Sequence, residues 1–110
     1  MVAKINTGSS LFGALSYNQE KLDSEEAKIL YSNRIMQDSD GGHNMYLHLK
    51  SFEPYLMANN KTEKPVLHIS LNPHPDDKLS DEQMRDIAQE YMDKMGYGDQ
   101  PYIVFKHEDL

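Results

Sequence analysis

Histidines are the residues whose type could most directly support metal-dependent chemistry in this sequence. The chain contains five of them and no cysteine, so a metal site would have to use imidazole and carboxylate ligands. His43 and His48 are five positions apart, which does not put them on one face of a helix. His68 shares an expected strand face with Ser70, and His107 closes the last expected strand. Spacing alone therefore assigns none of these histidines to a metal site.

Tyr17 is the side chain best suited to nucleophilic chemistry among the seven tyrosines. The expected helix runs from Leu11 to about Lys21, and Tyr17 lies about 240° around it from Leu11, away from its apolar face. Such a tyrosine is usually only a surface residue, but an outward phenol is also what a nucleophile requires. Because a phenol has a pKa of about 10, attack on phosphorus needs an activated tyrosine and a phosphate polarised by a metal ion. Tyr31, in an expected strand beside Leu30, is the less favoured alternative.

The elements that must position these residues alternate between short strands and helices. Strands are expected at residues 2–5, 28–35, 66–71 and 101–106, and helices at about 11–21, 43–58 and 81–95. The third helix has the clearest signals, since Ser80 is its N-cap, Gln83 completes a capping box and Gly96 follows its last turn. Pro54 predicts a kink or a restart of the second helix near Phe52. The order β-α-β-α-β-α-β predicts an α+β or α/β layer structure.

The composition is that of one small acidic domain. A chain of 110 residues can bury one modest core, and no apolar run reaches the roughly 20 residues that span a bilayer, so we expect a cytoplasmic protein without a membrane segment. The net charge of −7 argues against generic nucleic-acid binding, which depends on lysine and arginine contacts to phosphates. A DNA-binding function would require the acidic residues to lie away from the DNA.

Three stretches, taken in order, resemble conjugative relaxases, also called mobilisation endonucleases, especially those of Bacteroides-type mobile elements. The first is the opening Met1-Val-Ala-Lys-Ile-Asn-Thr-Gly-Ser-Ser-Leu-Phe-Gly-Ala-Leu-Ser-Tyr17-Asn. The second is Leu67-His68-Ile69-Ser70-Leu71-Asn72-Pro73 with the capped helix after it, and the third is Tyr102-Ile-Val-Phe-Lys-His107-Glu-Asp109. Each motif is weak alone, but their order and spacing extend the resemblance over essentially the whole chain.

The resemblance implies an α+β fold of the HUH relaxase type, with a central antiparallel sheet flanked by helices. It assigns Tyr17 as the nucleophile and Ser70, with His68 on the same strand face, as DNA contacts near the nick. It also assigns His107 as a metal ligand and Asp109 as a supporting acid. In the complete enzyme, a divalent metal (Mg or Mn) on three imidazoles would polarise the scissile phosphate of single-stranded origin DNA. Tyr17 would form a 5′-phosphotyrosine and leave a 3′-hydroxyl that the reverse reaction rejoins, and accessory mobilisation proteins are expected partners.

In the family, a His-hydrophobe-His pair follows the first metal histidine, and this sequence ends at Leu110 before such a pair. We therefore interpret residues 1–110 as the N-terminal portion of a relaxase domain, without the strand that carries the pair. One imidazole holds a divalent ion poorly, so weak metal binding and no nicking are expected of these residues alone. Open strand edges recruit other chains, which predicts a homo-oligomer or a strand-swapped dimer.

Two other functions are compatible with the residues. A small acidic interaction module without enzymatic activity would fit the charge and the scattered histidines, with the helix at residues 81–95 as its packing element. A tyrosine nuclease of the replication-initiator type would share the chemistry of metal and tyrosine. Its tyrosine usually follows the histidine pair, however, whereas Tyr17 precedes the whole core. The order of the residues therefore favours the relaxase.

Overall fold

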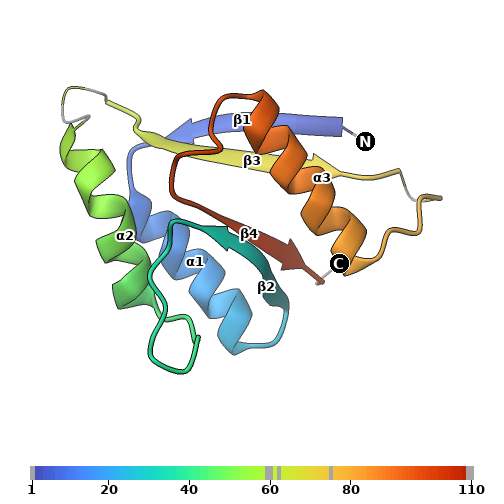
Figure 1. Cartoon of the computed structure of the whole chain (residues 1–110), viewed down its shortest axis with the longest axis horizontal. Coiled ribbons are helices and arrows are strands. Elements are labelled where there is room, and N and C mark those ends of the chain that lie inside the picture. Colours follow the sequence, from blue (N-terminus) through green and yellow to red (C-terminus); the bar gives the residue numbers. More distant parts are fainter. Residues whose placement is uncertain (1, 59–60, 62, 75, 109–110) are drawn as a thin grey trace.

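Seven elements of secondary structure alternate along the chain in the computed structural model, which describes residues 2–58, 61, 63–74 and 76–108 (Figure 1). In order they are β1 (Val2–Gly8), α1 (Leu11–Asp23), β2 (Ala27–Asn33), α2 (Met45–Ala58), β3 (Val66–Asn72), α3 (Asp81–Lys94) and β4 (Tyr102–His107). The predicted order of strands and helices is confirmed, and so is the α+β class. The first strand is longer than predicted, and the second helix begins at Met45 and not at His43.

The four strands form two separate antiparallel pairs, β1–β3 and β2–β4. The first pair is regular, from Val2 opposite Asn72 to Gly8 opposite Val66. The resemblance predicted antiparallel strands flanked by helices, and the structure has both, but the strands make two pairs where one central sheet was expected. Within the described part of the chain, each strand therefore has one edge without a strand partner. Self-association through these edges stays a prediction.

The second strand pair contains one extra residue on β2. Leu30 is that residue, since the register between β2 and β4 shifts between Ile29 and Tyr31. The Leu30 side chain is buried, and the backbone carbonyl oxygen of Leu30 accepts a hydrogen bond of 2.8 Å from Nε of Arg85 on α3. The helix thus satisfies a backbone group at the point where the ladder is irregular.

The helix ends form as the sequence predicts. Ser10 caps α1 by accepting a hydrogen bond of 2.9 Å from Gly13 N. Ser80 and Gln83 form the predicted capping box of α3, with hydrogen bonds of 3.1 and 2.8 Å. Gly96 follows α3 with a φ of +86°, a left-handed conformation that glycine adopts at little cost. Local side-chain chemistry therefore determines where these helices begin and end.

Pro54 lies inside α2, yet the helix is continuous from Met45 to Ala58, so no restart occurs near Phe52. The other expectation, a kink at this position, stays a prediction. Proline has no backbone N–H, so one carbonyl oxygen of the preceding turn lacks its helical hydrogen bond. Pro54 is exposed, so water can bind that carbonyl oxygen. The packed side of α2, which includes the buried Ser51, then holds the helix together across this position.

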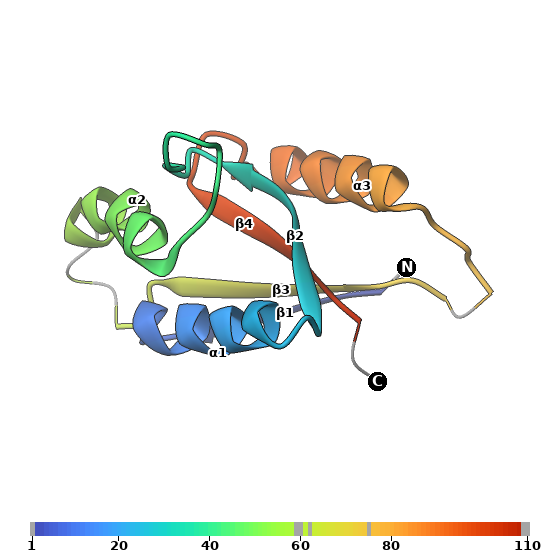
Figure 2. The same ribbon diagram turned by 90° about the horizontal axis from the view of Figure 1, so that it is seen from below.

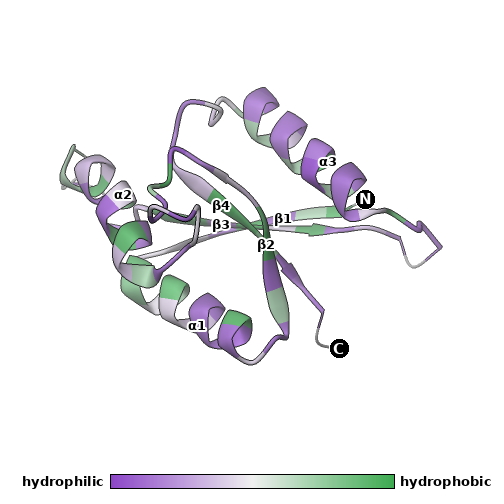
Figure 3. Cartoon of the chain, turned by 60° about the horizontal axis from the view of Figure 1, so that its bottom comes forward, coloured by the Kyte–Doolittle hydropathy of each residue, from purple (hydrophilic) through white to green (hydrophobic). Residues whose placement is uncertain are grey.

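The strands lie between α1 and α3, and the core forms around them (Figure 2). Its buried apolar side chains are Leu15, Ala27, Leu30, Val66, Ala88 and Tyr102. Figure 3 shows further hydrophobic segments on α1, on α2 and in the β2–β4 pair, whereas α3 is largely hydrophilic. The radius of gyration is 14.1 Å, against about 13 Å for a compact chain of this length. The fold is thus slightly expanded.

Candidate active site

Tyr17 and His107 lie next to each other because of the short connection between α1 and β2. The helix ends at Asp23 and the strand begins at Ala27, so the start of β2 lies beside the last turns of α1. Ala27 is the register partner of His107 on β4. The antiparallel pairing therefore brings the end of β4 back to the helix that carries Tyr17.

The rings of Tyr17 and His107 are stacked, with their centroids 6.1 Å apart and their planes at 28°. The Tyr17 side chain is 55% exposed, so the predicted outward orientation of this phenol is confirmed. His107 is exposed as well. A phenol and an imidazole therefore face solvent together at one place on the surface, where a large substrate could reach both.

Asn18 contacts His107 from the residue next to Tyr17. Its Nδ2 donates a hydrogen bond of 2.9 Å to the carbonyl oxygen of Ala14, one turn earlier on α1. Its Oδ1 accepts a hydrogen bond of 2.9 Å from His107 Nε2, although the two residues are 89 positions apart in the sequence. Tyr17 and Asn18, which are neighbours on α1, thus both contact the imidazole of His107. Tyr17 contacts the face of the ring and Asn18 contacts Nε2. Asn18 was not among the site residues predicted from the sequence.

Lys21 brings positive charge to the same place. Its Nζ lies 5.7 Å from the centroid of the Tyr17 ring, within the range of a cation–π interaction. It also forms an ion pair of 2.8 Å with Glu26, so this charge is partly balanced. Lys21 lies four residues after Tyr17, a spacing that puts two side chains on one helix face. This spacing is the sequence signal that could have predicted a lysine beside Tyr17.

Ser70 and His68, the predicted DNA contacts, lie on β3 and are exposed. In the β1–β3 ladder they face Lys4 and Asn6 of β1. A cleft of about 1430 Å³ is lined by residues of all seven elements, and these include Tyr17, His68, Ser70 and His107 as well as the buried Leu15 and Ala88. Because the cleft extends through most of the fold, its shared lining alone does not bring His68 and Ser70 next to Tyr17. Of the four predicted site residues, Tyr17 and His107 are in ring contact with each other.

Asp109, the predicted supporting acid, lies outside the described residues. Among the residues that the structure does describe, no three histidine, cysteine or acidic side chains come close enough to hold a metal ion together. A catalytic metal site needs about three protein ligands, and His107 is one imidazole. The described part of the chain therefore does not fit a complete metal site, and the role of His107 as a metal ligand stays a prediction.

A cluster of charged side chains anchors β4 behind His107. Lys28 and Lys106 are register partners on β2 and β4, and two like charges opposite each other destabilise a strand pair unless an acid compensates them. Asp81, at the start of α3, binds both, with 2.7 Å between its Oδ1 and Lys106 Nζ. These two lysines, Lys106 first, lower the pKa of Asp81 to about 2. Glu108 adds a further ion pair with Lys28 at 3.3 Å.

His43 and His48 form a second histidine cluster, which the sequence analysis discounted because of their spacing. That argument assumed that both lie on one helix, but His43 precedes α2, whose first turn is capped by Asn44. The two rings meet with 3.1 Å between His43 Nδ1 and His48 Nε2. His48 is only 2% exposed, and burial, together with the neighbouring His43, lowers its pKa. This cluster lies inside the fold, between α2 and the segment before it.

Tyr31, the alternative nucleophile, has a different environment from Tyr17. It lies on β2, half-buried, with its ring 5.9 Å from that of Tyr102. Its hydroxyl donates a hydrogen bond of 3.4 Å to Asn33 Oδ1. These contacts are those of a packing residue.

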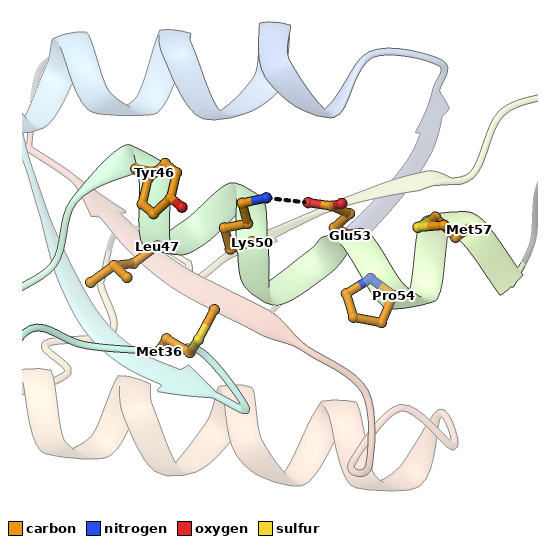
Figure 4. A pocket seen from close by; sticks show the side chains of 7 residues that line it. All are labelled: Met36, Tyr46, Leu47, Lys50, Glu53, Pro54 and Met57. Carbon is orange, nitrogen blue, oxygen red and sulfur yellow. Dashed lines mark ion pairs between the residues drawn. The ribbon is translucent and has the colours of Figure 1, made fainter.

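A smaller hollow of about 500 Å³ lies on α2 (Figure 4). Lys50 and Glu53 form an ion pair of 3.2 Å at its edge. The side chains that line it are Met36, Tyr46, Leu47, Lys50, Glu53, Pro54 and Met57. Met36, Tyr46 and Met57 are all exposed. The hollow lies away from the helix at residues 81–95, which the interaction-module alternative named as its packing element. None of the predicted site residues lies in this hollow.

Comparison with known proteins identifies a family that this chain matches. The family described as "Relaxase: MobA/VirD2-like, nuclease domain" matches residues 17–110, from Tyr17 through Ser70 and His107. The resemblance of residues 1–16 lies outside this range. No curated protein and no solved structure matches the chain. In the described residues, no helix is long and apolar enough to cross a membrane. Because the match covers most of the sequence, the chain belongs to the MobA/VirD2-like relaxase nuclease domain family.

Proposed function

We propose that this protein nicks one strand of DNA by transesterification, with Tyr17 as the nucleophile, in the mobilisation of a plasmid or another mobile element. The phenolic oxygen of Tyr17 forms a bond to the scissile phosphorus, and the bond from phosphorus to the 3′-oxygen breaks. The phenolic proton passes to the leaving 3′-oxygen. The products are a 5′-phosphotyrosine and a free 3′-hydroxyl, and attack of this hydroxyl in the reverse direction rejoins the strand. The energy of the phosphodiester is thereby retained for rejoining.

The observation that carries the proposal is the exposed stack of Tyr17 on His107 in a chain of the relaxase nuclease family. A phosphodiester in a DNA strand is bulky, so it can reach only a phenol that faces solvent. Tyr17 meets this requirement at 55% exposure, and the half-buried Tyr31 meets it less well. Family membership supplies the reaction class. Tyr46 is also exposed, so Tyr17 is selected by its exposure together with its ring contact to His107.

The DNA strand is proposed to follow the cleft that Tyr17 shares with Ser70 and His68. The hydroxyl of Ser70 and the imidazole of His68 can donate hydrogen bonds to phosphate oxygens, and Lys21 adds positive charge beside the phenol. These contacts help to offset the net charge of −7, which would repel a polyanion from most of the surface.

His107 is proposed as one ligand of a divalent metal, Mg or Mn, which relaxase nuclease domains generally use. Such an ion would act as a Lewis acid on the phosphate. The described residues do not complete its ligand set. Asp109 keeps its proposed supporting role.

The test uses the complete protein as its gene encodes it, with a supercoiled plasmid that carries the DNA surrounding that gene. The expected result is a nicked plasmid and a protein–DNA adduct that survives denaturing detergent. Tyr17→Phe removes the nucleophilic oxygen with little change of shape, so both products should fall below detection. Parallel reactions with Mg²⁺, with Mn²⁺ and with a chelator measure the need for metal.

Two control variants sharpen this test. Tyr46→Phe alters a tyrosine that is 65% exposed, as open as Tyr17 but on α2, and should leave the adduct unchanged. Tyr31→Phe should also leave it unchanged, which separates the two candidate nucleophiles. An adduct that persists in Tyr17→Phe and disappears in Tyr31→Phe would refute the assignment of Tyr17.

A further inference from the structure

We infer that the pair of His43 and His48 is a pH-sensitive latch, which holds residues 34–44 against α2 in neutral solution and releases them when the pair is protonated. The inference goes beyond the proposed function, because this region contains none of the predicted site residues. It rests on the few contacts that hold the segment, on the burial of His48 and on the hydrogen bond between the two rings.

Residues 34–44 connect β2 to α2 without helix or strand, and most of them are exposed. Two hydrogen bonds reach from this segment to the two buried residues of α2. Met36 N donates to Ser51 Oγ at 2.8 Å, and His43 Nδ1 lies 3.1 Å from His48 Nε2. A segment that buries little apolar surface opens at a low cost in free energy. Loss of one of these two contacts can therefore release it while the rest of the domain stays folded.

The surroundings of His48 favour its neutral form. The residue is 2% exposed, and burial, followed by the neighbouring His43, lowers its pKa below the ordinary value of 6.5. The ring centroids are 5.3 Å apart, so two positive charges would repel each other strongly. A hydrogen bond between two imidazole nitrogens also needs one nitrogen without a proton. A doubly protonated pair thus loses its bond, and lifting the segment off α2 lets water reach the charge.

The other charged groups around His48 do not compensate a proton there. The elements that pack around it are the segment, α2 itself and α1, whose Ser16 Oγ donates to Met45 Sδ at 3.9 Å. The tyrosines on these elements are neutral below pH 7. Their charged side chains are exposed or paired elsewhere, namely Arg34, Asp38 and Asp40 on the segment, Lys50 and Glu53 on α2, and Glu20, Lys21 and Asp23 on α1.

Release of the segment would also change the hollow on α2 (Figure 4). Met36 belongs to the segment and lines this hollow opposite Tyr46 and Leu47 of the helix. Its backbone N–H makes the bond to Ser51, so Met36 moves with the segment when that bond opens. Acidification would therefore remove one wall of the hollow and expose more of α2.

Amide hydrogen exchange, followed by nuclear magnetic resonance on the 110-residue chain at about pH 7.5 and about pH 5.5, tests the inference. The reporter is the amide of Met36. If only the open form takes up a proton, with a pKa of about 6.5, the protection factor of this amide should fall about tenfold after correction for intrinsic exchange. The amide of Gln83 also donates to a serine hydroxyl, but on α3, so its protection should not change.

Two variants identify the group that responds. His48→Gln keeps a hydrogen-bonding side chain that cannot titrate, so the protection of Met36 should become independent of pH. His74→Gln makes the same substitution at an exposed histidine after β3 and should retain the tenfold change. If His48→Gln does not fold, as judged by circular dichroism, ring ¹⁵N shifts of His48 in the unsubstituted chain replace it. Protonation of this ring must then follow the same pH curve as the loss of Met36 protection.

Three results would overturn the inference. The first is constant protection of Met36 while the His48 ring becomes protonated. The second is an equal loss at Met36 and Gln83, which would indicate unfolding of the whole domain. The third is an undiminished pH effect in folded His48→Gln, which would assign the release to another group. Because no DNA is present, the measurement is independent of the adduct assay.

Discussion

In the described part of the chain, the surroundings of His107 and the pair of His43 and His48 differ in exposure and in the distance along the sequence between the residues that meet. His107 lies at the surface, stacked on the exposed Tyr17 and bonded to Asn18. His48 is 2% exposed and bonded to His43, and His43 in turn receives a contact of 3.1 Å from Gln37. The first cluster joins α1 to the end of β4, which are far apart in the sequence, whereas the second joins a helix to the segment just before it.

The difference indicates that one cluster is suited to chemistry and the other to structure. In the His43–His48 pair the two imidazole nitrogens that meet form a hydrogen bond with each other. Ser51 makes further hydrogen bonds nearby. Ser51 Oγ accepts from Met36 N at 2.8 Å and donates to Leu47 O at 2.7 Å, which ties the segment before α2 to the helix. At the other cluster, the phenol of Tyr17 faces solvent and the cleft. Exposure and not residue type therefore separates the candidate site from the scaffold.

The largest expected difference between the clusters is in stability. His48→Ala should lower the free energy of unfolding by about 2–4 kcal/mol, because it opens a cavity and leaves His43 without its buried partner. His107→Ala should cost less than about 1 kcal/mol, since its ring is exposed. Urea denaturation followed by circular dichroism measures both values. Equal losses in the two variants would contradict the division into scaffold and site.

The pH dependence of stability should identify the buried cluster. Burial and His43 lower the pKa of His48 below its ordinary value of 6.5. Below about pH 6.5 the unfolded chain therefore binds a proton at His48 more readily than the folded chain does. The contribution of neutral His48 to the free energy of unfolding is complete above this pH and decreases as the pH falls. The slope for one group is at most about 1.4 kcal/mol per pH unit.

This pH effect is measured as the free energy of unfolding between pH 7.5 and 5. The variant His48→Gln, which does not titrate, should show a flatter profile than the unsubstituted chain. A profile of the same slope in both proteins would mean that other groups cause the loss.

The smallest stability effect is expected at two lysines that make the same kinds of contact on the neighbouring helices α1 and α2. Lys21 lies 5.7 Å from the Tyr17 ring and binds Glu26, and Lys50 lies 5.8 Å from the Tyr46 ring and binds Glu53. Each substitution by methionine should cost less than about 1 kcal/mol, because exposed ion pairs contribute little.

Binding of single-stranded DNA should nevertheless distinguish these two lysines. Lys21→Met should reduce the slope of log affinity against log salt by about 0.7, the value for one lost phosphate contact, whereas Lys50→Met should not change it. Fluorescence anisotropy with a labelled oligonucleotide gives the slope. An effect of Lys50→Met as large as that of Lys21→Met would show that the DNA does not prefer the side of Tyr17.

The sequence by itself determined the features that depend on a few neighbouring residues. The order of strands and helices, the caps at Ser10 and Ser80 and the glycine after α3 all depend on interactions within about one turn of the chain. The exposure of Tyr17 was predictable for the same reason, since one helix and its apolar face fix the direction of a side chain. The family was recognisable because its motifs keep their order along the chain.

Only the tertiary structure decided which of these elements meet. The separation of the strands into two pairs, the compensation of Lys28 and Lys106 by Asp81, and the bond from His107 to Asn18 all join residues that are distant in the sequence. Such contacts depend on how whole elements pack, and periodicity within one element carries no information about its neighbours. The meeting of His43 and His48 was missed for a related reason, because a helix boundary two residues away changed the direction of one ring.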